Sequence, residues 1–321
     1  MGDISIEEKT VPVDSSDSLS GAETVELAAW KVSRNPHKTE KAGSSYALWV
    51  HANGFAGQMW LPVIQALDED VTVDSHIVFD LRGQGRSSKP KAVPENYAWD
   101  LQAEDALAVI RKMAGPAARV HGVGHSMGAA ILVLAAARYP ETFASLVLFE
   151  PIIMVPHRLG NLPAEQNPLI DRAMRRKATF ENLEEARSRL GSKPPFSFFR
   201  PDVFEAYIEH GFRREEGKTV LACPPEIEAV NYLVGSRHGG YEALEKLQCP
   251  VLLAQGERSP KGGPLDASAL VDRVIKARYV EIKNTTHFAP FENPERFAQV
   301  VADFWKSLPG GTSEPDASTA E

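Results

Sequence analysis

Cysteine is scarce in this sequence, which contains only Cys223 and Cys249. Each is followed by proline, and neither stands in a C-x-x-C or Cys/His spacing. Neither a disulfide framework nor a structural zinc site is therefore indicated. We expect both residues to be buried small hydrophobes or unreactive surface thiols, and the sequence implies no metal and no organic cofactor.

Long apolar runs and an excess of positive charge are also missing. No window approaches the roughly 20 apolar residues that a membrane span requires. The sequence has 35 Lys and Arg and 43 Asp and Glu, which gives a net charge of −8. Electrostatic binding to nucleic acid or to an anionic bilayer is therefore not indicated. No basic segment followed by an apolar one opens the chain, which makes the cytosol the expected location. A small molecule is the expected partner, and the oligomeric state is left open.

What is present is an alternation of apolar runs with helical patterns over most of the 321 residues. Strands are predicted at 25–32 (as an edge strand), 46–50, 76–79, 120–123, 145–149, 251–254 and 278–282, and a last amphipathic helix at 294–308. Strands that alternate with helices predict an α/β protein with a mostly parallel sheet and helices on both faces. Segments 1–20 and 308–321 are rich in Ser, Asp, Gly and Pro, and we expect them to be disordered tails.

One long segment, residues 152–243, interrupts this alternation. It lacks an apolar β-like run, and Leu183, Ala186 and Leu190 recur at helical spacing. A helical insertion is predicted here, between two parts of a core formed by residues 21–151 and 244–307. Because active sites of open α/β sheets lie at the strand ends, such an insertion would form a lid. The alternative is a helical decoration without a role in access.

The strongest local motif is Gly124-His125-Ser126-Met127-Gly128, between the predicted strand at 120–123 and a helical pattern from Ala129. A G-x-S-x-G turn in this strand-turn-helix context exposes its serine as a nucleophile. Glycine is needed because side chains at Gly124 and Gly128 would collide with the neighbouring helix and strand. Ser126 is the predicted nucleophile.

A serine hydroxyl needs a base with a pKa near neutrality, which indicates histidine. Among the nine histidines we choose His287, because it follows the last predicted strand and precedes the last helix. A loop at that place can reach back over the serine turn. His121 and His125 have a spacing of four residues but straddle a strand and a turn, so they would point apart and not form a metal pair.

These motifs resemble the α/β-hydrolase fold, and the matching stretches run from about residue 46 to about residue 305. Segment 51–57 with Trp60 is similar to the family's oxyanion loop, and segment 80–87 to its Asp-x-Arg-Gly-x-Gly-x-Ser turn. Segment 148–151 and parts of 193–212 look similar to uncharacterised bacterial and fungal hydrolases, which resemble in turn the fungal peroxisomal lipase and toxin-biosynthesis hydrolase branch. The resemblance implies an α/β-hydrolase fold with a helical lid inserted after the sixth strand.

The resemblance also implies an oxyanion hole made of backbone N–H groups. It assigns them to Met127, directly after the nucleophile, and to Asn53. Ala52 stands where the family usually has glycine, which leaves Gly54 open as the donor in place of Asn53. Asp80 and Arg82 are expected to hold their turn instead of touching substrate.

The acid that orients the histidine is the point where this sequence departs from the family. The usual Gly-x-x-Asp phrase is replaced by Gly256-Glu257-Arg258-Ser259, with serine at the acid position. Glu150, at the end of the sixth strand, is the first choice, because its place resembles the acid of haloalkane dehalogenases and pancreatic-type lipases. Glu257 is the second choice and Asp266 the third.

The predicted function is that of a serine hydrolase which cleaves a carboxylic ester of a small or medium apolar substrate through an acyl-enzyme on Ser126. Hydrolysis of a carbon–carbon bond or a thioester by the same residues is one alternative. A ligand-binding protein that keeps the fold without turnover is another. Aromatic residues of the insertion could contact an apolar acyl group, and the basic residues at 172 and 175–177 could attract a carboxylate.

Overall fold

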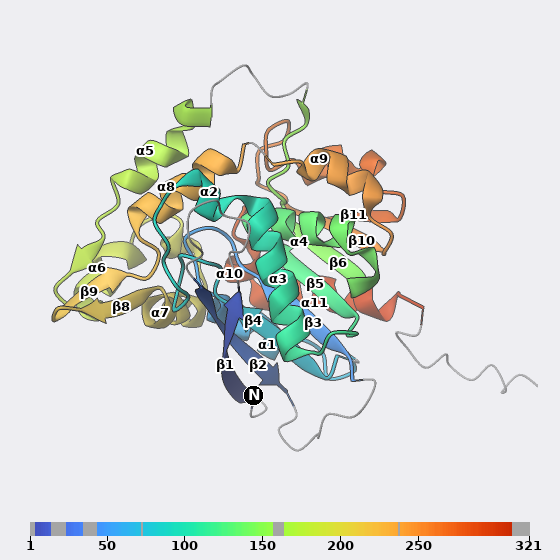
Figure 1. The fold of residues 1–321 in the computed structure, drawn as a ribbon, viewed down its shortest axis with the longest axis horizontal. Helices are drawn as coiled ribbons and strands as arrows, with labels where there is room; N and C mark the ends of the chain where they lie inside the picture. The colour runs from blue at the N-terminus through green and yellow to red at the C-terminus, as the bar shows by residue number, and fades with distance from the viewer. Residues whose placement is uncertain are drawn as a thin grey trace, which may run out of the picture.

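A central sheet of eight strands organises the molecule, as the computed structural model shows (Figure 1). The structure describes residues 4–13, 24–34, 44–71, 73–156, 164–236 and 238–309. The sheet order is β1-β2-β4-β3-β5-β6-β10-β11. The strands are β1 (Ser5–Val13), β2 (Val25–Ser33), β3 (Tyr46–Val50), β4 (Ser75–Phe79), β5 (Val120–His125), β6 (Phe143–Phe149), β10 (Val251–Gly256) and β11 (Ala277–Ile282).

All neighbouring strands from β4 to β11 pair in parallel, whereas β1 with β2 and β2 with β4 pair antiparallel. Alternate residues of a strand face opposite sides of a sheet. Leu48 and Val50 therefore join one hydrophobic core, and Ala47 and Trp49 join the other. A mostly parallel sheet with both faces covered, as predicted from the sequence, is confirmed.

Helices cover both faces of the sheet. The first core includes α3 (Trp99–Met113) and α4 (Met127–Arg138), which lie in front of the sheet in Figure 1. The second core includes α1 (Leu61–Gln65) and α11 (Pro294–Lys306). Two short helices, α2 (Pro94–Tyr97) and α10 (Ala289–Glu292), lie in connections between these elements. No helix of the described part of the chain has the length and apolar character needed to cross a bilayer, and the expected cytosolic location stays a prediction.

The prediction of a disordered tail over residues 1–20 is wrong for residues 5–13. These form β1, which pairs with β2 along its whole length and buries Val11 and Val13 in the first core. An edge strand keeps one side in solvent and tolerates charges and proline. The composition of β1 therefore resembles that of a disordered tail. Because β1 occupies the edge of the sheet, β2 is an inner strand and not the predicted edge strand. Residues 1–3, 14–20 and 310–321 of the two predicted tails lie outside the described residues.

The segment between β6 and β10 is only partly helical, which corrects the prediction for 152–243. Its helices are α5 (Pro168–Met174), α6 (Leu183–Gly191), α7 (Pro201–His210), α8 (Pro225–Val234) and α9 (Gly240–Ala243). A second sheet joins them, with β9 (Lys218–Leu221) between β7 (Thr179–Phe180) and β8 (Phe212–Glu215). The hairpin turns at Glu216-Gly217, both with positive φ. Strands this short and polar carry no apolar pattern, so the sequence did not reveal them.

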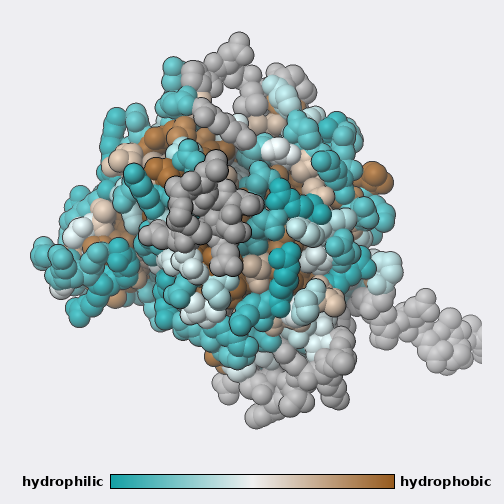
Figure 2. Space-filling view, viewed as in Figure 1, coloured by the Kyte–Doolittle hydropathy of each residue, from teal (hydrophilic) through white to brown (hydrophobic). Residues whose placement is uncertain are grey.

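The surface of this insertion is mixed in character. Figure 2 shows hydrophilic side chains over most of the visible face, with hydrophobic ones gathered near α5 and α8. Leu169 and Met174 of α5 are among the exposed large hydrophobic residues. The insertion also binds the core, because Arg200 N–H donates to the carbonyl oxygen of Phe291 at 2.9 Å.

Candidate active site

A sharp turn between β5 and α4 presents Ser126. Its backbone has φ 59° and ψ −118°, a conformation that side chains disfavour. The Ser126 N–H donates to the carbonyl oxygen of Phe149 at 2.9 Å, which ties the turn to the end of β6. A Cβ at Gly124 would lie 2.6 Å from Ala129 Cα, and one at Gly128 would lie 2.3 Å from the Val50 carbonyl oxygen. Side chains at these two glycines would therefore collide with α4 and β3, as expected from the sequence.

We expect Gly128→Ala to lower the free energy of unfolding by about 2 kcal/mol or more, because its methyl group would overlap backbone atoms that cannot move aside. Chemical denaturation measures the effect. Gly263→Ala is the matched control, since a Cβ there meets no atom within 4 Å. Equal stabilities of the two variants would contradict this steric account of the turn.

The three residues predicted as nucleophile, base and first-choice acid lie in one hydrogen-bonded chain. His287 follows β11, and its Nε2 lies 3.1 Å from Ser126 Oγ. Its Nδ1 lies 2.6 Å from Glu150 Oε2. Because a carboxylate only accepts, this contact places the imidazole proton on Nδ1 and leaves the Nε2 lone pair toward the serine.

Glu150 is fixed by the neighbouring strand β10. The residue directly follows β6, has φ 42° and is fully buried. Its backbone N–H donates to the Ala254 carbonyl oxygen at 2.9 Å, and its Oε1 accepts from Gly256 N–H at 2.8 Å. One carboxylate oxygen is thus held by the sheet while the other meets His287.

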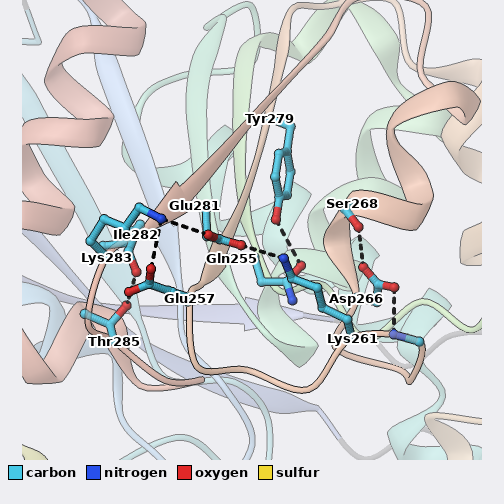
Figure 3. A network of polar contacts seen from close by, with 12 residues as sticks. Gln255, Glu257, Lys261, Asp266, Ser268, Tyr279, Glu281, Ile282, Lys283 and Thr285 are labelled. Carbon is cyan, nitrogen blue, oxygen red and sulfur yellow. Dashed lines mark hydrogen bonds and ion pairs between the residues drawn. The ribbon is translucent and has the colours of Figure 1, made fainter.

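The second-choice and third-choice acids are occupied elsewhere (Figure 3). Glu257 accepts from Asn284 N–H at 2.8 Å and from Lys283 Nζ at 2.9 Å, and these two contacts hold the pKa of that carboxyl below its usual range. Asp266 accepts from Gly262 N–H at 2.8 Å and from Ser268 Oγ at 2.5 Å. The structure brings neither carboxylate to His287.

The loop at residues 51–57, called the oxyanion loop below, is bound to the turn that follows β4. His51 Nδ1 donates to the Ala52 carbonyl oxygen at 2.7 Å, and His51 Nε2 accepts from Leu81 N–H at 3.0 Å. Gly57 N–H donates to Asp80 Oδ1 at 2.7 Å. Asp80 therefore holds the two loops together, which is the structural role expected for it.

Of the two N–H groups left open by the sequence, that of Gly54 is already used. It donates to Gln84 Oε1 at 2.7 Å. The Asn53 and Met127 N–H groups donate to no acceptor within the described part of the chain. The geometry therefore favours Asn53 over Gly54 beside the serine.

Several contacts that support His287 were not predicted from the sequence. His125 Nε2 donates to the His287 carbonyl oxygen at 2.8 Å. Glu292 accepts from Thr286 N–H at 2.9 Å and also from the Thr286 hydroxyl. The only local signal for these two residues is their position in the chain, since His125 is next to Ser126 and Glu292 is near His287. Arg82, expected to hold its turn, does so through two 2.6 Å contacts with Asp105 of α3.

No three His, Cys, Asp or Glu side chains form a cluster that could hold a metal ion in the part of the chain that the structure describes. His121 contacts Ser145 Oγ at 2.8 Å, whereas His125 contacts the His287 backbone. The two do not form a metal pair. Cys223 and Cys249 are both free and buried.

We expect the free energy of unfolding to fall as the pH is lowered from about 7 to about 5. Burial lowers the pKa of His51 to about 4 and that of His76 to about 3, so in this window only the unfolded chain takes up their protons, near pH 6.5. Each of these two histidines would lower the free energy of unfolding by about 2 kcal/mol when the pH reaches 5. Asp80 opposes this in part, because burial raises its pKa to about 6 and its proton then favours the folded state. Urea denaturation at several pH values measures the slope, and His76→Gln should flatten it; a stability that rises toward pH 5 would contradict this account.

Known proteins share this fold and part of the sequence. Residues 47–300 match the Alpha/beta hydrolase family. An abhydrolase domain-containing protein of Alternaria alternata is 25% identical over 220 residues, 57% of this chain and 81% of its own length. Rhodomycin D methylesterase DauP of Streptomyces sp. (strain C5) is 28% identical over 259 residues, 73% of this chain and 82% of its own.

A solved structure gives the same result for the fold. The peroxisomal alpha-beta-hydrolase Lpx1 of Saccharomyces cerevisiae has a TM-score of 0.76 over 95% of this chain and 90% of its own, at 17% identity. The resemblance predicted from the sequence motifs, including that to the fungal peroxisomal branch, is confirmed. The match over residues 47–300 shows that this chain belongs to the alpha/beta hydrolase family.

Proposed function

We propose that this chain is a serine hydrolase that cleaves a carboxylic ester of a small or medium apolar substrate through an acyl-enzyme on Ser126. The observation that carries this proposal is the chain of contacts from Glu150 through His287 to Ser126, at 2.6 Å and 3.1 Å. Such an arrangement lets a histidine activate a serine hydroxyl that would otherwise be a poor nucleophile.

In the first step, Ser126 Oγ attacks the acyl carbon while His287 Nε2 accepts its proton. In the resulting imidazolium, Nδ1–H keeps donating its hydrogen bond to Glu150, and the buried carboxylate stabilises the positive charge. His287 then returns the other proton to the leaving alcohol. Water then attacks the acyl carbon while His287 Nε2 accepts one of its protons. The bond between the acyl carbon and Ser126 Oγ breaks, His287 returns this proton to Ser126 Oγ, and the acid is released.

The oxyanion that forms in each step would accept from the Asn53 and Met127 N–H groups. Both are without another acceptor among the described residues. Met127 is also the first residue of α4, where the helix dipole adds positive potential to the site. Preorganised donors of this kind stabilise charge that develops only in the transition state.

Aromatic rings beside His287 support an apolar substrate. Phe288 lies 5.3 Å from the His287 ring, 6.2 Å from Phe55 of the oxyanion loop and 5.6 Å from Phe199 of the insertion, between ring centroids. Phe55 and Phe288 are only partly buried. The insertion therefore supplies one side of the apolar surroundings, which supports its role as a lid.

The basic residues of the insertion do not support a carboxylate-bearing substrate. Arg176 pairs with Glu228, Lys177 with Glu185, and Arg175 lies 3.7 Å from Asp171. The charges of these three residues are balanced by neighbours, whereas Arg172 has no such partner among the described residues. The relative named Rhodomycin D methylesterase supports an ester as the substrate.

A fluorophosphonate probe tests the proposal without knowledge of the substrate, because it reacts with activated serines. Purified wild type should be labelled, and Ser126→Ala should not. A panel of esters of increasing acyl length, with a matched thioester, then measures the preferred substrate class. A folded wild type that neither reacts with the probe nor turns over any ester would overturn the proposal in favour of a ligand-binding protein.

A further inference from the structure

The insertion contacts three successive residues of the oxyanion loop. The first contact is made by Asn53, whose side-chain Nδ2 donates to the Glu228 carbonyl oxygen of α8 at 2.9 Å. Beside Gly54, the Arg176 and Glu228 side chains lie so close that a Cβ added to this glycine would be 3.4 Å from both Arg176 Nη1 and Glu228 Oε1. The third is at Phe55, which packs edge-on against Tyr207 of α7 at 5.8 Å.

The insertion residues that make these contacts are bound to one another. Arg176 donates through Nη1 to Glu228 and through Nη2 to the Tyr207 hydroxyl at 2.9 Å. Glu228 is 7% exposed, and Tyr207 is 1% exposed. Charges this well buried are costly unless they are paired, so removal of one partner disturbs the other. The three side chains come from separate segments of the insertion, and their pairing fixes the surface on which the oxyanion loop rests.

The core holds the other side of the same loop. Gln84 accepts from Gly54 N–H, and His51 accepts from Leu81 N–H. Among the described residues the Asn53 N–H has no acceptor, while its side chain donates to the Glu228 carbonyl oxygen of α8. The residue that carries this N–H group is therefore held by both the core and the insertion.

We propose that Arg176, Glu228 and Tyr207, together with the Asn53 side chain, are positioning residues that set the Asn53 N–H for the oxyanion. The inference rests on the proposed function, since it needs a reaction that forms an oxyanion at Ser126. In this proposal the insertion helps to set the geometry of the oxyanion donors and also covers the active site. A shift of a donor by about 1 Å can reduce a rate by about 100-fold, so small movements of this cluster would be measurable.

Asn53→Ala tests the tether most directly, because it removes the side-chain contact with Glu228 and keeps the backbone N–H. We expect kcat for the best ester of the panel to fall by about tenfold or more, with KM changed by less than about threefold. The affinity for an alkyl boronic acid, which forms a tetrahedral adduct on serine, should fall in parallel with kcat/KM.

Arg176→Met and Glu228→Gln test the ion pair, and each should lower kcat in the same way. Arg176→Lys keeps the charge but not the two-pronged contact with Glu228 and Tyr207, so it should recover only part of the activity. Arg200→Met is the matched control. Arg200 pairs with Glu295 of α11 and with Asp202, so it also joins the insertion to the core, but its ion pairs include no residue of the oxyanion loop and none of the proposed positioning residues. This control should keep kcat and boronate affinity within about twofold.

Thermal unfolding of each variant separates positioning from loss of fold, and all kinetics are measured on protein shown to be folded. A wild type without turnover or labelling defeats the proposed function itself. An active wild type whose Asn53→Ala variant keeps its kcat and its boronate affinity overturns the positioning role alone. If Arg176→Met does not fold, the Asn53→Ala result still decides between the two outcomes.

Discussion

Replacing Ser126 by alanine is expected to lower kcat/KM for the best ester by about 10⁴-fold or more, because no other group takes the place of the nucleophile in the chain of contacts to His287 and Glu150. Alanine keeps the Cβ and introduces no new atom at the φ of 59°. The free energy of unfolding should therefore change by no more than about 1 kcal/mol. Steady-state kinetics and urea denaturation measure the two quantities.

Ser259→Ala is the matched control for this variant. Its hydroxyl is also buried, and it has no hydrogen-bond partner among the described residues. Loss of that hydroxyl should leave both kinetics and stability near wild type. Turnover retained by Ser126→Ala in a preparation free of other esterases would rule out Ser126 as the nucleophile.

The second large effect is expected for Glu150→Gln, which should lower kcat by about 10³- to 10⁴-fold. Gly256 N–H needs an acceptor, so the glutamine oxygen would face Gly256 and the amide NH₂ would face His287 Nδ1. The imidazole would then carry its proton on Nε2 and could not accept the serine proton. The substitution also removes the charge that stabilises the imidazolium.

Glu257→Gln is the comparison that ranks the two candidate acids. Glu257 contacts Lys283 and Asn284 at the surface, so its variant should keep kcat within about twofold. Measurement of kcat and of the fluorophosphonate labelling rate for both variants shows which of the two carboxylates contributes more to activity. A larger loss in Glu257→Gln than in Glu150→Gln would refute the assignment of Glu150.

The sheet and the serine turn could be predicted because their signals are local. Apolar runs such as residues 46–50 and 251–254 follow from burial on both faces of a parallel sheet. Gly124 is required by its contact with Ala129 within the same turn, and Gly128 by its contact with Val50 of the neighbouring strand β3. Local patterns failed where strands were short or at an edge, as in β1 and β7–β9.

The acid and the oxyanion donor needed the tertiary structure. Glu150 and Glu257 each directly follow a strand and Asp266 lies in the connection after β10, and only the packing of β6 against β10 brings one of these carboxylates to His287. The resemblance assigns the donor to Asn53 and leaves Gly54 open, and in the tertiary structure Gln84 uses the Gly54 N–H.

The fold class, the turn that presents Ser126 and the loop that carries His287 can be predicted from the sequence alone. Their causes are the period of hydrophobic residues and backbone sterics, which act between near neighbours in the chain. The tertiary structure decided the partner of His287, the free N–H group at Asn53, and the meeting of Arg176, Tyr207 and Glu228 against the oxyanion loop. Contacts between side chains distant in sequence depend on the relative placement of whole elements, and no local pattern encodes that placement.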